Sequence, residues 1–332
     1  MSSKAASGPV VAVRTAVGRA VEDLPGGSVL LVACSGGPDS LALAGGAAWV
    51  GARRGLDVRA LVVDHGLQDG SDVVATEAAA TCRALGIRQT DVVGVLVGTG
   101  GGPEAAARAA RYAALEQAAL DIGAAAVLLG HTREDQAETV LLRLARGSGA
   151  RSLSAMRSRA GLWRRPLLGL PRADVHAAAA DLLVPLGLAP WADPHNDDPG
   201  FARVRVRALL DDLRAAAGPG AVLGLTRSAD LLRDDADALD GWAAEAAEAT
   251  VVADDLGLSA DCAELLALPR AVRTRVVRDM CVRQGCPTDA LTFEHVGRVD
   301  ALVGDWRGQG EIRLPGGVVA LRSYGRLCLR SP

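Results

Sequence analysis

The loop that follows the first apolar run of the chain carries residues suited to binding an anion. The run Val29–Cys34 is followed by a helical run, Leu41–Arg53, and between them stand Ser35-Gly36-Gly37-Pro38-Asp39-Ser40. A continuous apolar run is typical of a buried parallel strand, and proline suits the first turn of a helix because its missing N–H has no intrahelical partner there. We therefore expect strand, loop and helix. The amides of the first three loop residues, at a helix N-terminus, predict a phosphate site.

A second polar group begins where another apolar run, Ala126–Leu129, ends. The residues that follow are Gly130-His131-Thr132-Arg133-Glu134-Asp135-Gln136-Ala137-Glu138-Thr139. On a helix, Asp135 shares one face with Glu138 and Thr139, because residues three and four apart are neighbours. Two carboxylates beside bound phosphates suit Mg²⁺, which proteins hold through one or two carboxylates plus phosphate oxygens. The alternative is that these acids only complement the helix dipole.

Alternating strands and helices must position both groups. Apolar patterning predicts strands at 57–64, 87–97 and 126–129, and helices at 9–22 and 72–85. Such alternation implies right-handed crossovers and an α/β fold with a doubly wound parallel sheet, which binds ligands at the carboxyl ends of its strands. His65 and Gly66 follow one such strand end, and Arg108, Arg111 and Tyr112 lie on a helix that Pro103 begins.

Composition describes an ordinary globular chain. Hydrophobic residues make up 49% of the 332 residues and charged residues 23%, so two or three domains are expected. No long apolar run or signal pattern is present, so we expect a cytoplasmic protein with no membrane partner. The six cysteines form no C-x-x-C pair, which argues against a disulfide framework, a zinc ribbon or an iron–sulfur site.

Arginines gather in two places although the formal net charge is only −3. Eight of them and no acid lie between Arg143 and Arg172, a stretch we call the arginine belt, and we expect it to contact RNA phosphates or to be a solvated surface. Arg203, Arg205 and Arg207 follow a turn cluster at Asp193–Asp198, and their spacing leaves a strand, a loop or a helix open. His176 and His295 are interpreted as surface or core histidines of helices rather than as ligands.

The last third of the chain has a different pattern. Residues 219–249 predict a long connector helix, and beyond it we expect helices at 265–278 and 291–303 and a hairpin that turns at 314–318. A small α+β domain is the interpretation for residues 251–332. Arg270, Arg273, Arg275 and Arg278 could add phosphate contacts there.

Several motifs together resemble one family. The loop Ser35–Ser40 looks like the pyrophosphate loop of the N-type ATP pyrophosphatase superfamily, and it lacks both the Walker pattern and Gly-x-Gly-x-x-Gly. With Asp64-His65-Gly66-Leu67, Arg108-x-x-Arg111-Tyr112, Gly130-His131-x-x-Glu134-Asp135, Arg146-Gly147-Ser148-Gly149, Trp191-x-Asp193-Pro194 and Arg203-x-Arg205-x-Arg207, it resembles the tRNA(Ile)-lysidine synthetase family across residues 28–215. Glu134, His195 and Val204 depart from the family pattern.

The resemblance implies a fold, a domain order and an activity. The fold would be adenine nucleotide alpha hydrolase-like, with an ATP-pyrophosphatase domain at 1–150, a catalytic extension at 151–218, a connector helix at 219–250 and a small tRNA-binding domain at 251–332. ATP would adenylate the wobble cytidine of the CAU anticodon of tRNA(Ile), and free lysine would then displace AMP, releasing AMP and pyrophosphate and changing decoding from AUG to AUA. The cofactors implied are ATP and Mg²⁺.

The same resemblance implies roles for individual residues. Asp39 and Asp135 would hold Mg²⁺ with Glu138 nearby, and Arg205 would stabilise the transition state, so these four are the expected catalytic residues. The expected nucleotide-binding residues are Ser35, Gly36, Gly37, Pro38, Asp39, Ser40, His65, Arg108, Arg111, Gly130 and His131. Other interpretations are a tRNA 2-thiolation enzyme, an amide ligase of the GMP- or NAD-synthetase kind, and a noncatalytic nucleotide-binding regulator.

Overall fold

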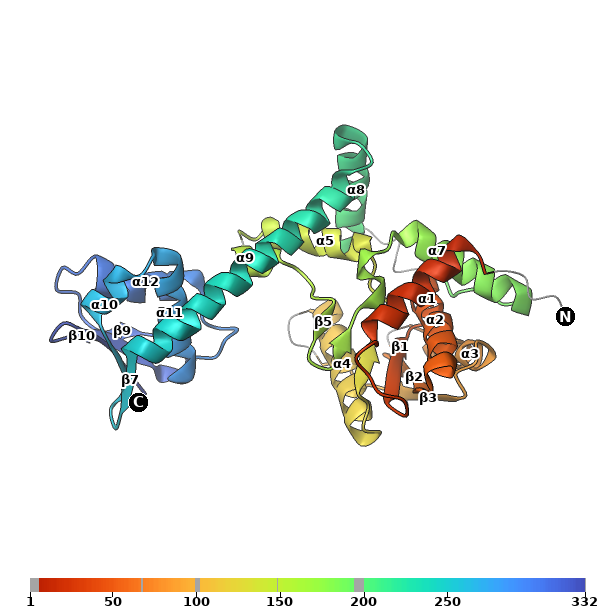
Figure 1. The fold of residues 1–332 in the computed structure, drawn as a ribbon, viewed down its shortest axis with the longest axis horizontal. Helices are drawn as coiled ribbons and strands as arrows, with labels where there is room; N and C mark the ends of the chain where they lie inside the picture. The colour runs from red at the N-terminus through yellow and green to blue at the C-terminus, as the bar shows by residue number, and fades with distance from the viewer. Residues whose placement is uncertain (1–5, 67, 99–101, 148, 194–199, 332) are drawn as a thin grey trace. The chain divides into compact units, whose positions relative to one another are not determined.

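The computed structural model describes the chain apart from residues 1–5, 67, 99–101, 148, 194–199 and 332 (Figure 1). The chain forms two compact units, Met1–Asp230 and Leu231–Pro332, and the long helix α9 (Ala221–Thr250) contributes to both. Most of the expected turn cluster after Asp193 lies outside the described residues. Within the part that is described, no helix is both long and apolar enough to cross a membrane.

The first unit is built on one mostly parallel sheet. Its strands lie in the order β3-β2-β1-β4-β6-β5, and all neighbours run parallel except β5 and β6. These strands are β1 (Val29–Cys34), β2 (Asp57–Asp64), β3 (Gln89–Gly94), β4 (Ala126–Leu128), β5 (Arg159–Ala160) and β6 (Trp163–Arg164). The helices are α1 (Gly8–Ala20), α2 (Pro38–Arg54), α3 (Ser71–Ala84), α4 (Pro103–Asp121), α5 (Arg133–Leu144), α6 (Ala150–Leu153), α7 (Arg172–Leu183) and α8 (Ala202–Ala217), with short 3-10 turns η1 (Pro166–Gly169) and η2 (Val184–Leu186).

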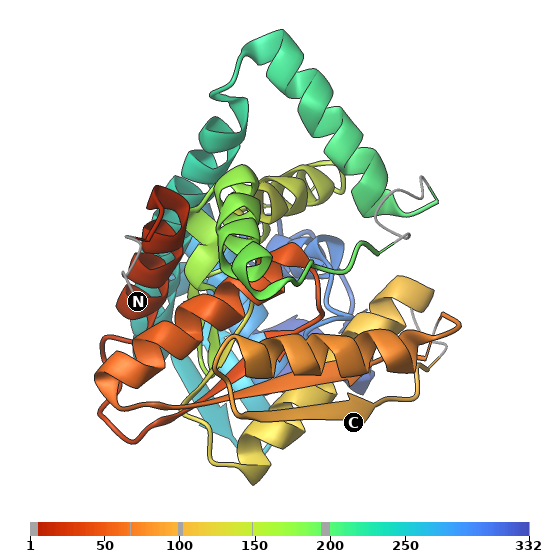
Figure 2. The same ribbon diagram turned by 90° about the vertical axis from the view of Figure 1, so that its right-hand side faces the viewer.

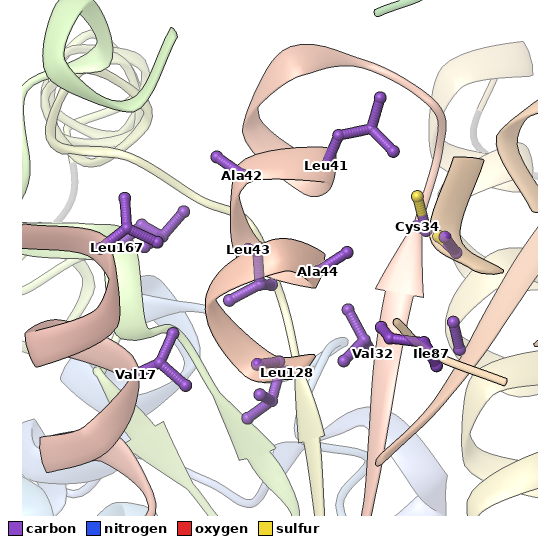
Figure 3. Packing of buried hydrophobic residues seen from close by; sticks show 14 of the residues in the cluster. Val17, Val32, Cys34, Leu41, Ala42, Leu43, Ala44, Ile87, Leu128 and Leu167 are labelled. Atoms are coloured by element: carbon purple, nitrogen blue, oxygen red, sulfur yellow. The ribbon is translucent and has the colours of Figure 1, made fainter. Parts of the chain in front are cut away.

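Strand β1 is buried on both faces, as its apolar run predicts. Leu30 and Val32 pack with the core that contains residues of α1, α2, α3 and α7, whereas Leu31 and Ala33 pack with Leu115 of α4 on the opposite face. Figure 2 shows α4 across the sheet from α2 and α3, and Figure 3 shows side chains of α2 between α1 and β1. The alternation of side chains along a strand places one set on each face, so the loop after β1 is held by two cores.

The doubly wound α/β fold expected from the sequence is confirmed, with local differences at element ends. The predicted strand 87–97 is shorter, because Ile87 closes the turn after α3 through a bond from its amide to the Cys82 carbonyl at 3.0 Å. Helix α2 begins at Pro38, so Asp39 and Ser40 already belong to its first turn. Segment 151–218 adds β5 and β6 to the main sheet, since β6 pairs with β4.

The second unit has a five-stranded antiparallel sheet in the order β7-β8-β11-β10-β9. Its elements are β7 (Val251–Asp254), β8 (Gly257–Asp261), α10 (Cys262–Ala267), α11 (Arg270–Arg283), α12 (Phe293–Gly304), β9 (Ile312–Arg313), η4 (Pro315–Gly317), β10 (Val319–Ser323) and β11 (Arg326–Arg330). The expected turn at 314–318 is confirmed between β9 and β10. The expected helix at 265–278 is wrong: it is broken at Leu268, because the residue before Pro269 is forced into extended backbone.

Candidate active site

The loop Ser35–Ser40 lies at the carboxyl end of the sheet, in the wall of a cavity of about 780 Å³. The cavity is also lined by residues that follow β2, by α4, by α7 and by α8. The polar and aromatic residues that line it include Asp64, His65, Arg111, Arg172, His176, Trp191, Arg203 and Arg207. The structure thus brings the loop Ser35–Ser40, the end of β2 and several arginines together at the carboxyl ends of the strands, where such a sheet binds ligands.

Glycine and serine give this loop its shape. Gly36 has a φ of +81°, and a Cβ there would meet the Ala78 Cβ of α3 at 3.0 Å. The Ser40 hydroxyl donates to the Gly37 carbonyl at 2.9 Å and accepts from the Ser35 amide at 3.2 Å. The Ser35 amide is therefore engaged within the loop, which narrows the expected anion site to the amides at the start of α2. There the helix dipole favours an anion.

Two half-buried side chains line the same cavity as the loop: His65, which follows β2, and Arg111 on α4. Burial lowers the pKa of His65, the neighbouring Arg111 lowers it further, and Asp64 opposes them, so the imidazole is neutral at pH 7. Burial also lowers the pKa of Arg111, which lies near Arg108 and Arg203, but an arginine keeps its charge at neutral pH. Arg111 therefore adds positive charge to the wall of the cavity.

Asp135 lies in the first turn of α5, and both of its carboxylate oxygens accept hydrogen bonds. Its Oδ2 accepts from the Thr132 amide at 2.6 Å and from the Thr132 hydroxyl at 2.8 Å, which forms a capping box. Its Oδ1 accepts from Arg172 Nη2 at 2.9 Å. Burial alone would raise the pKa of Asp135, but the Arg172 charge and the Thr132 bonds outweigh it and lower the pKa. Asp135 is therefore ionised, and lone pairs remain on its oxygens.

Glu138 lies one turn further along α5 and is only 3% exposed. Its Oε1 accepts from Arg172 at 3.1 Å and from Arg207 Nε at 3.0 Å. A buried carboxylate must be paired in this way. The contacts of Glu138 therefore indicate a structural role, which is to hold Arg172 and Arg207 in place.

A second cavity, of about 750 Å³, is lined by these two acids, neither of which is among the lining residues of the first. Arg108, His131, Asp135, Glu138, Leu142, Met156, Phe201 and Arg203 are among its lining residues. Burial lowers the pKa of His131 to about 3, so this imidazole is neutral. Arg108 donates to the Tyr112 hydroxyl at 3.1 Å. The two arginines of the Arg108-x-x-Arg111 motif thus line different cavities.

Gly130 allows two segments of the backbone to pack closely together. A Cβ at this position would meet the Asp39 carbonyl oxygen at 3.1 Å and the Ser40 Cα at 3.3 Å. Because the end of β4 approaches the start of α2 so closely, the two motifs recognised in the sequence are locked together.

Asp39 fits a divalent cation shared with phosphates. Its Oδ1 is buried and lacks a hydrogen-bond partner among the described residues. Mg²⁺ is held by one or two carboxylates together with substrate phosphates, and such a site needs no closed cage of protein ligands. No cluster of three or more His, Cys, Asp or Glu side chains that could hold a metal occurs in the described part of the chain.

Arg203, Arg205 and Arg207 lie on a helix, one of the conformations that their spacing left open. Segment 202–217 is helix α8, and residues four apart on a helix share a face while the one between them points away. Arg203 and Arg207 therefore line the phosphate-loop cavity, whereas Arg205 lines neither of the two cavities and donates to the Gly200 carbonyl at 2.8 Å. The catalytic role expected of Arg205 stays a prediction, and Arg203 is a second candidate because it lines both cavities.

The arginine belt is partly structural. Arg164 is 2% exposed and pairs with Asp23, and Arg159 contacts the same carboxylate at 2.8 Å. The bond to Arg164 lowers the pKa of Asp23 to about 2. Asp23, which is distant in the sequence, thus neutralises part of the belt, although the belt itself contains no acid. Arg157 is exposed and remains a candidate for phosphate contact.

His176 and Trp191 were not among the expected site residues, although Trp191 belongs to one of the motifs that carry the family resemblance. His176, interpreted as an ordinary helix histidine, lies with its Nε2 3.2 Å from Asp39 Oδ1. Trp191 donates its amide to the Gly36 carbonyl at 2.9 Å and so braces the loop. The available signal for His176 was its position one turn after Arg172 on the helix that Pro171 introduces.

Comparisons with known proteins agree with this geometry. A PP-loop domain family matches residues 11–213, and a TilS substrate binding domain family matches residues 261–328. Among solved structures, the U34-tRNA thiolase NcsA from Methanococcus maripaludis with its 4Fe-4S cluster is similar, with a TM-score of 0.55 and 20% identity. The similarity covers 68% of this chain and 78% of that one. It shows a shared fold.

Curated relatives are similar over nearly the whole chain. The tRNA(Ile)-lysidine synthase of Thermobifida fusca is 56% identical over 321 residues, which cover 96% of this chain and 97% of the relative. That of Streptomyces coelicolor is 51% identical over 311 residues, covering 92% and 86%. The chain belongs to the tRNA(Ile)-lysidine synthase family.

Proposed function

We propose that this protein ligates free lysine to C2 of the wobble cytidine in the CAU anticodon of tRNA(Ile), with ATP as the energy source. Ring carbon C2 is a poor electrophile, and adenylation of O2 turns that oxygen into a leaving group. The observation that carries the proposal is that the loop Ser35–Ser40 lines one cavity with Arg111, Arg172 and Arg203, and that Arg172 contacts Asp135 at 2.9 Å.

The triphosphate of ATP would lie on the loop at the start of α2. Helix N-terminal amides and the arginines Arg111 and Arg203 would bind its charge. Asp39 and Asp135 would hold Mg²⁺, which when bound neutralises phosphate charge as pyrophosphate leaves. Arg172 keeps Asp135 ionised and oriented, and its own pKa is raised by Asp135 and Glu138 against the opposing effect of burial.

The second cavity would receive the cytidine or the incoming lysine. Leu142, Met156 and Phe201 give it apolar walls, and Arg108, His131 and Arg203 give it polar groups. Single-stranded RNA bases are recognised by such stacking and hydrogen bonding, and an anticodon base is already unpaired. Because His131 is neutral, one ring nitrogen can accept a hydrogen bond from a base or an amine.

The second unit would contact the tRNA body. It contains all of the residues matched by the substrate binding domain family. Arg273 and Arg275 are paired with Asp300 and Asp240 at 2.7 and 2.8 Å, so they serve the fold of this unit. Arg270 makes a longer contact of 3.8 Å with Asp300, but its side chain is 71% exposed, so it is the better candidate for a phosphate contact. A cytoplasmic location accords with tRNA and ATP as substrates.

The proposal is tested by incubating the protein with ATP, Mg²⁺, labelled lysine and a tRNA(Ile) transcript that carries CAU. We expect label in the RNA that requires ATP and disappears when the wobble cytidine is replaced by uridine. Binding of ATP and tRNA without incorporation of lysine would contradict the proposal and would favour a noncatalytic nucleotide-binding regulator.

A further inference from the structure

Helix α7 presents two polar side chains to the two carboxylates that are proposed to hold the metal. Arg172 and His176 are four residues apart, so they lie on one face of the helix. Arg172 contacts Asp135 at 2.9 Å, and His176 Nε2 lies 3.2 Å from Asp39 Oδ1. Each carboxylate therefore has its own contact from α7, one turn apart.

The contact at Asp39 differs from the one at Asp135. Asp135 is fixed by Thr132 and Arg172, whereas Asp39 Oδ1 is buried and makes no aligned hydrogen bond with the described residues. His176 is the near neighbour that can supply one. A carboxylate only accepts, so Nε2 must carry the hydrogen, and the broad χ2 torsion of histidine allows the small rotation that aligns it.

We propose that His176 is a positioning residue that acts through Asp39, holding its carboxylate in the orientation that accepts the divalent cation of bound ATP. Carboxylates that bind metals are themselves held by outer hydrogen bonds, and loss of such a bond costs about 10- to 100-fold in metal affinity or activity. The imidazole side chain is 46% exposed and lies on the cavity wall, so it can turn without disturbing the core. This inference rests on the proposed metal and ATP site.

The test measures ATP binding without tRNA or lysine. The Mg²⁺ concentration that gives half-maximal binding of a nonhydrolysable ATP analogue is determined for wild type, His176→Ala and His176→Gln. We expect His176→Ala to raise it about tenfold. Glutamine places an amide N–H near the Nε2 position, so His176→Gln should stay within about threefold of wild type. Asp181→Ala, an exposed change on the same helix, serves as the matched control.

A double-mutant cycle shows whether His176 works through Asp39. In the Asp39→Asn background, His176→Ala should change the Mg²⁺ requirement less than twofold, because the group it positions has already lost its charge. An unchanged Mg²⁺ requirement in His176→Ala, tighter Mg²⁺ binding, or an equal effect in both backgrounds would overturn the inference. Because the assay contains no tRNA, failure here is distinct from failure to form lysidine.

Discussion

Arg207 and Glu138 form an ion pair between α8 and α5, with 3.0 Å between Nε and Oε1. Arg172 contacts the same Oε1 at 3.1 Å, so one buried carboxylate holds arginines from two helices. Helices α5 and α8 also meet through Ala137 and Leu210 in a small apolar core. The pairing therefore ties the position of α8, and with it Arg203, to the helix that carries Asp135.

Removal of the Glu138 charge should therefore cost stability first. Glu138→Gln leaves Arg172 and Arg207 facing a neutral group, and we expect a loss of about 2 kcal/mol in the free energy of unfolding, since both arginines are partly solvated. Urea denaturation measures this loss. A variant of unchanged stability with greatly reduced pyrophosphate release would show instead that Glu138 acts in the chemistry.

Arg203 and Arg205 offer a matched pair on one helix. Arg203→Ala should lower the rate of lysidine formation about 10²- to 10³-fold, the usual cost of one electrostatic contact in a transition state. Arg205→Ala should stay within about threefold of wild type because it lines neither cavity. The two rates are compared at saturating ATP and tRNA. The reverse ranking would return the catalytic role to Arg205.

The belt should divide into structural and RNA-binding arginines. Arg157→Ala should reduce the slope of log affinity for tRNA against log salt by about 0.7 to 0.9, the change for one lost phosphate contact. Arg164→Ala should leave that slope unchanged and lower the thermal unfolding temperature, because it removes the buried partner of Asp23. Equal slopes in wild type and Arg157→Ala would make the exposed belt a solvated surface.

His131 should make stability depend on pH. Its pKa is about 3 in the folded protein, against about 6.5 in an unfolded chain. Between these values the unfolded state binds the extra proton, so stability rises with pH in this window and is fully present above about 6.5. His131→Asn should remove up to about 1.4 kcal/mol per pH unit of this slope. Urea unfolding at pH 5 and 7 checks it, and identical slopes for the two proteins would contradict the assignment.

The sequence predicted the architecture of the first unit well because its signals are local. The apolar run before Ser35, the glycines of the loop and the acids after Gly130 each specify an element and its end. The sheet topology then required both motifs to meet at one edge, and Gly130 does lie against the backbone of Asp39 and Ser40.

What the sequence could not provide depends on contacts between distant residues. The pairing of Arg164 with Asp23 joins positions 141 apart, and that of Arg207 with Glu138 joins positions 69 apart. Spacing of two left the backbone at Arg203–Arg207 open, and only the helix shows that Arg205 points away from its neighbours. His176 lacked any pattern of its own, since its contact with Asp39 arises from the packing of α7 beside α2.

In the proposed reaction, ATP bound at the loop Ser35–Ser40 activates the cytidine before lysine reacts. The direct measurement uses ATP labelled in its α-phosphate and tRNA(Ile) without lysine. We expect label to enter the RNA and to leave as AMP when lysine is added, with entry slowed about 10²- to 10³-fold in Asp39→Asn. Label on lysine instead of on RNA, or AMP release without labelled RNA under rapid quenching, would contradict the account.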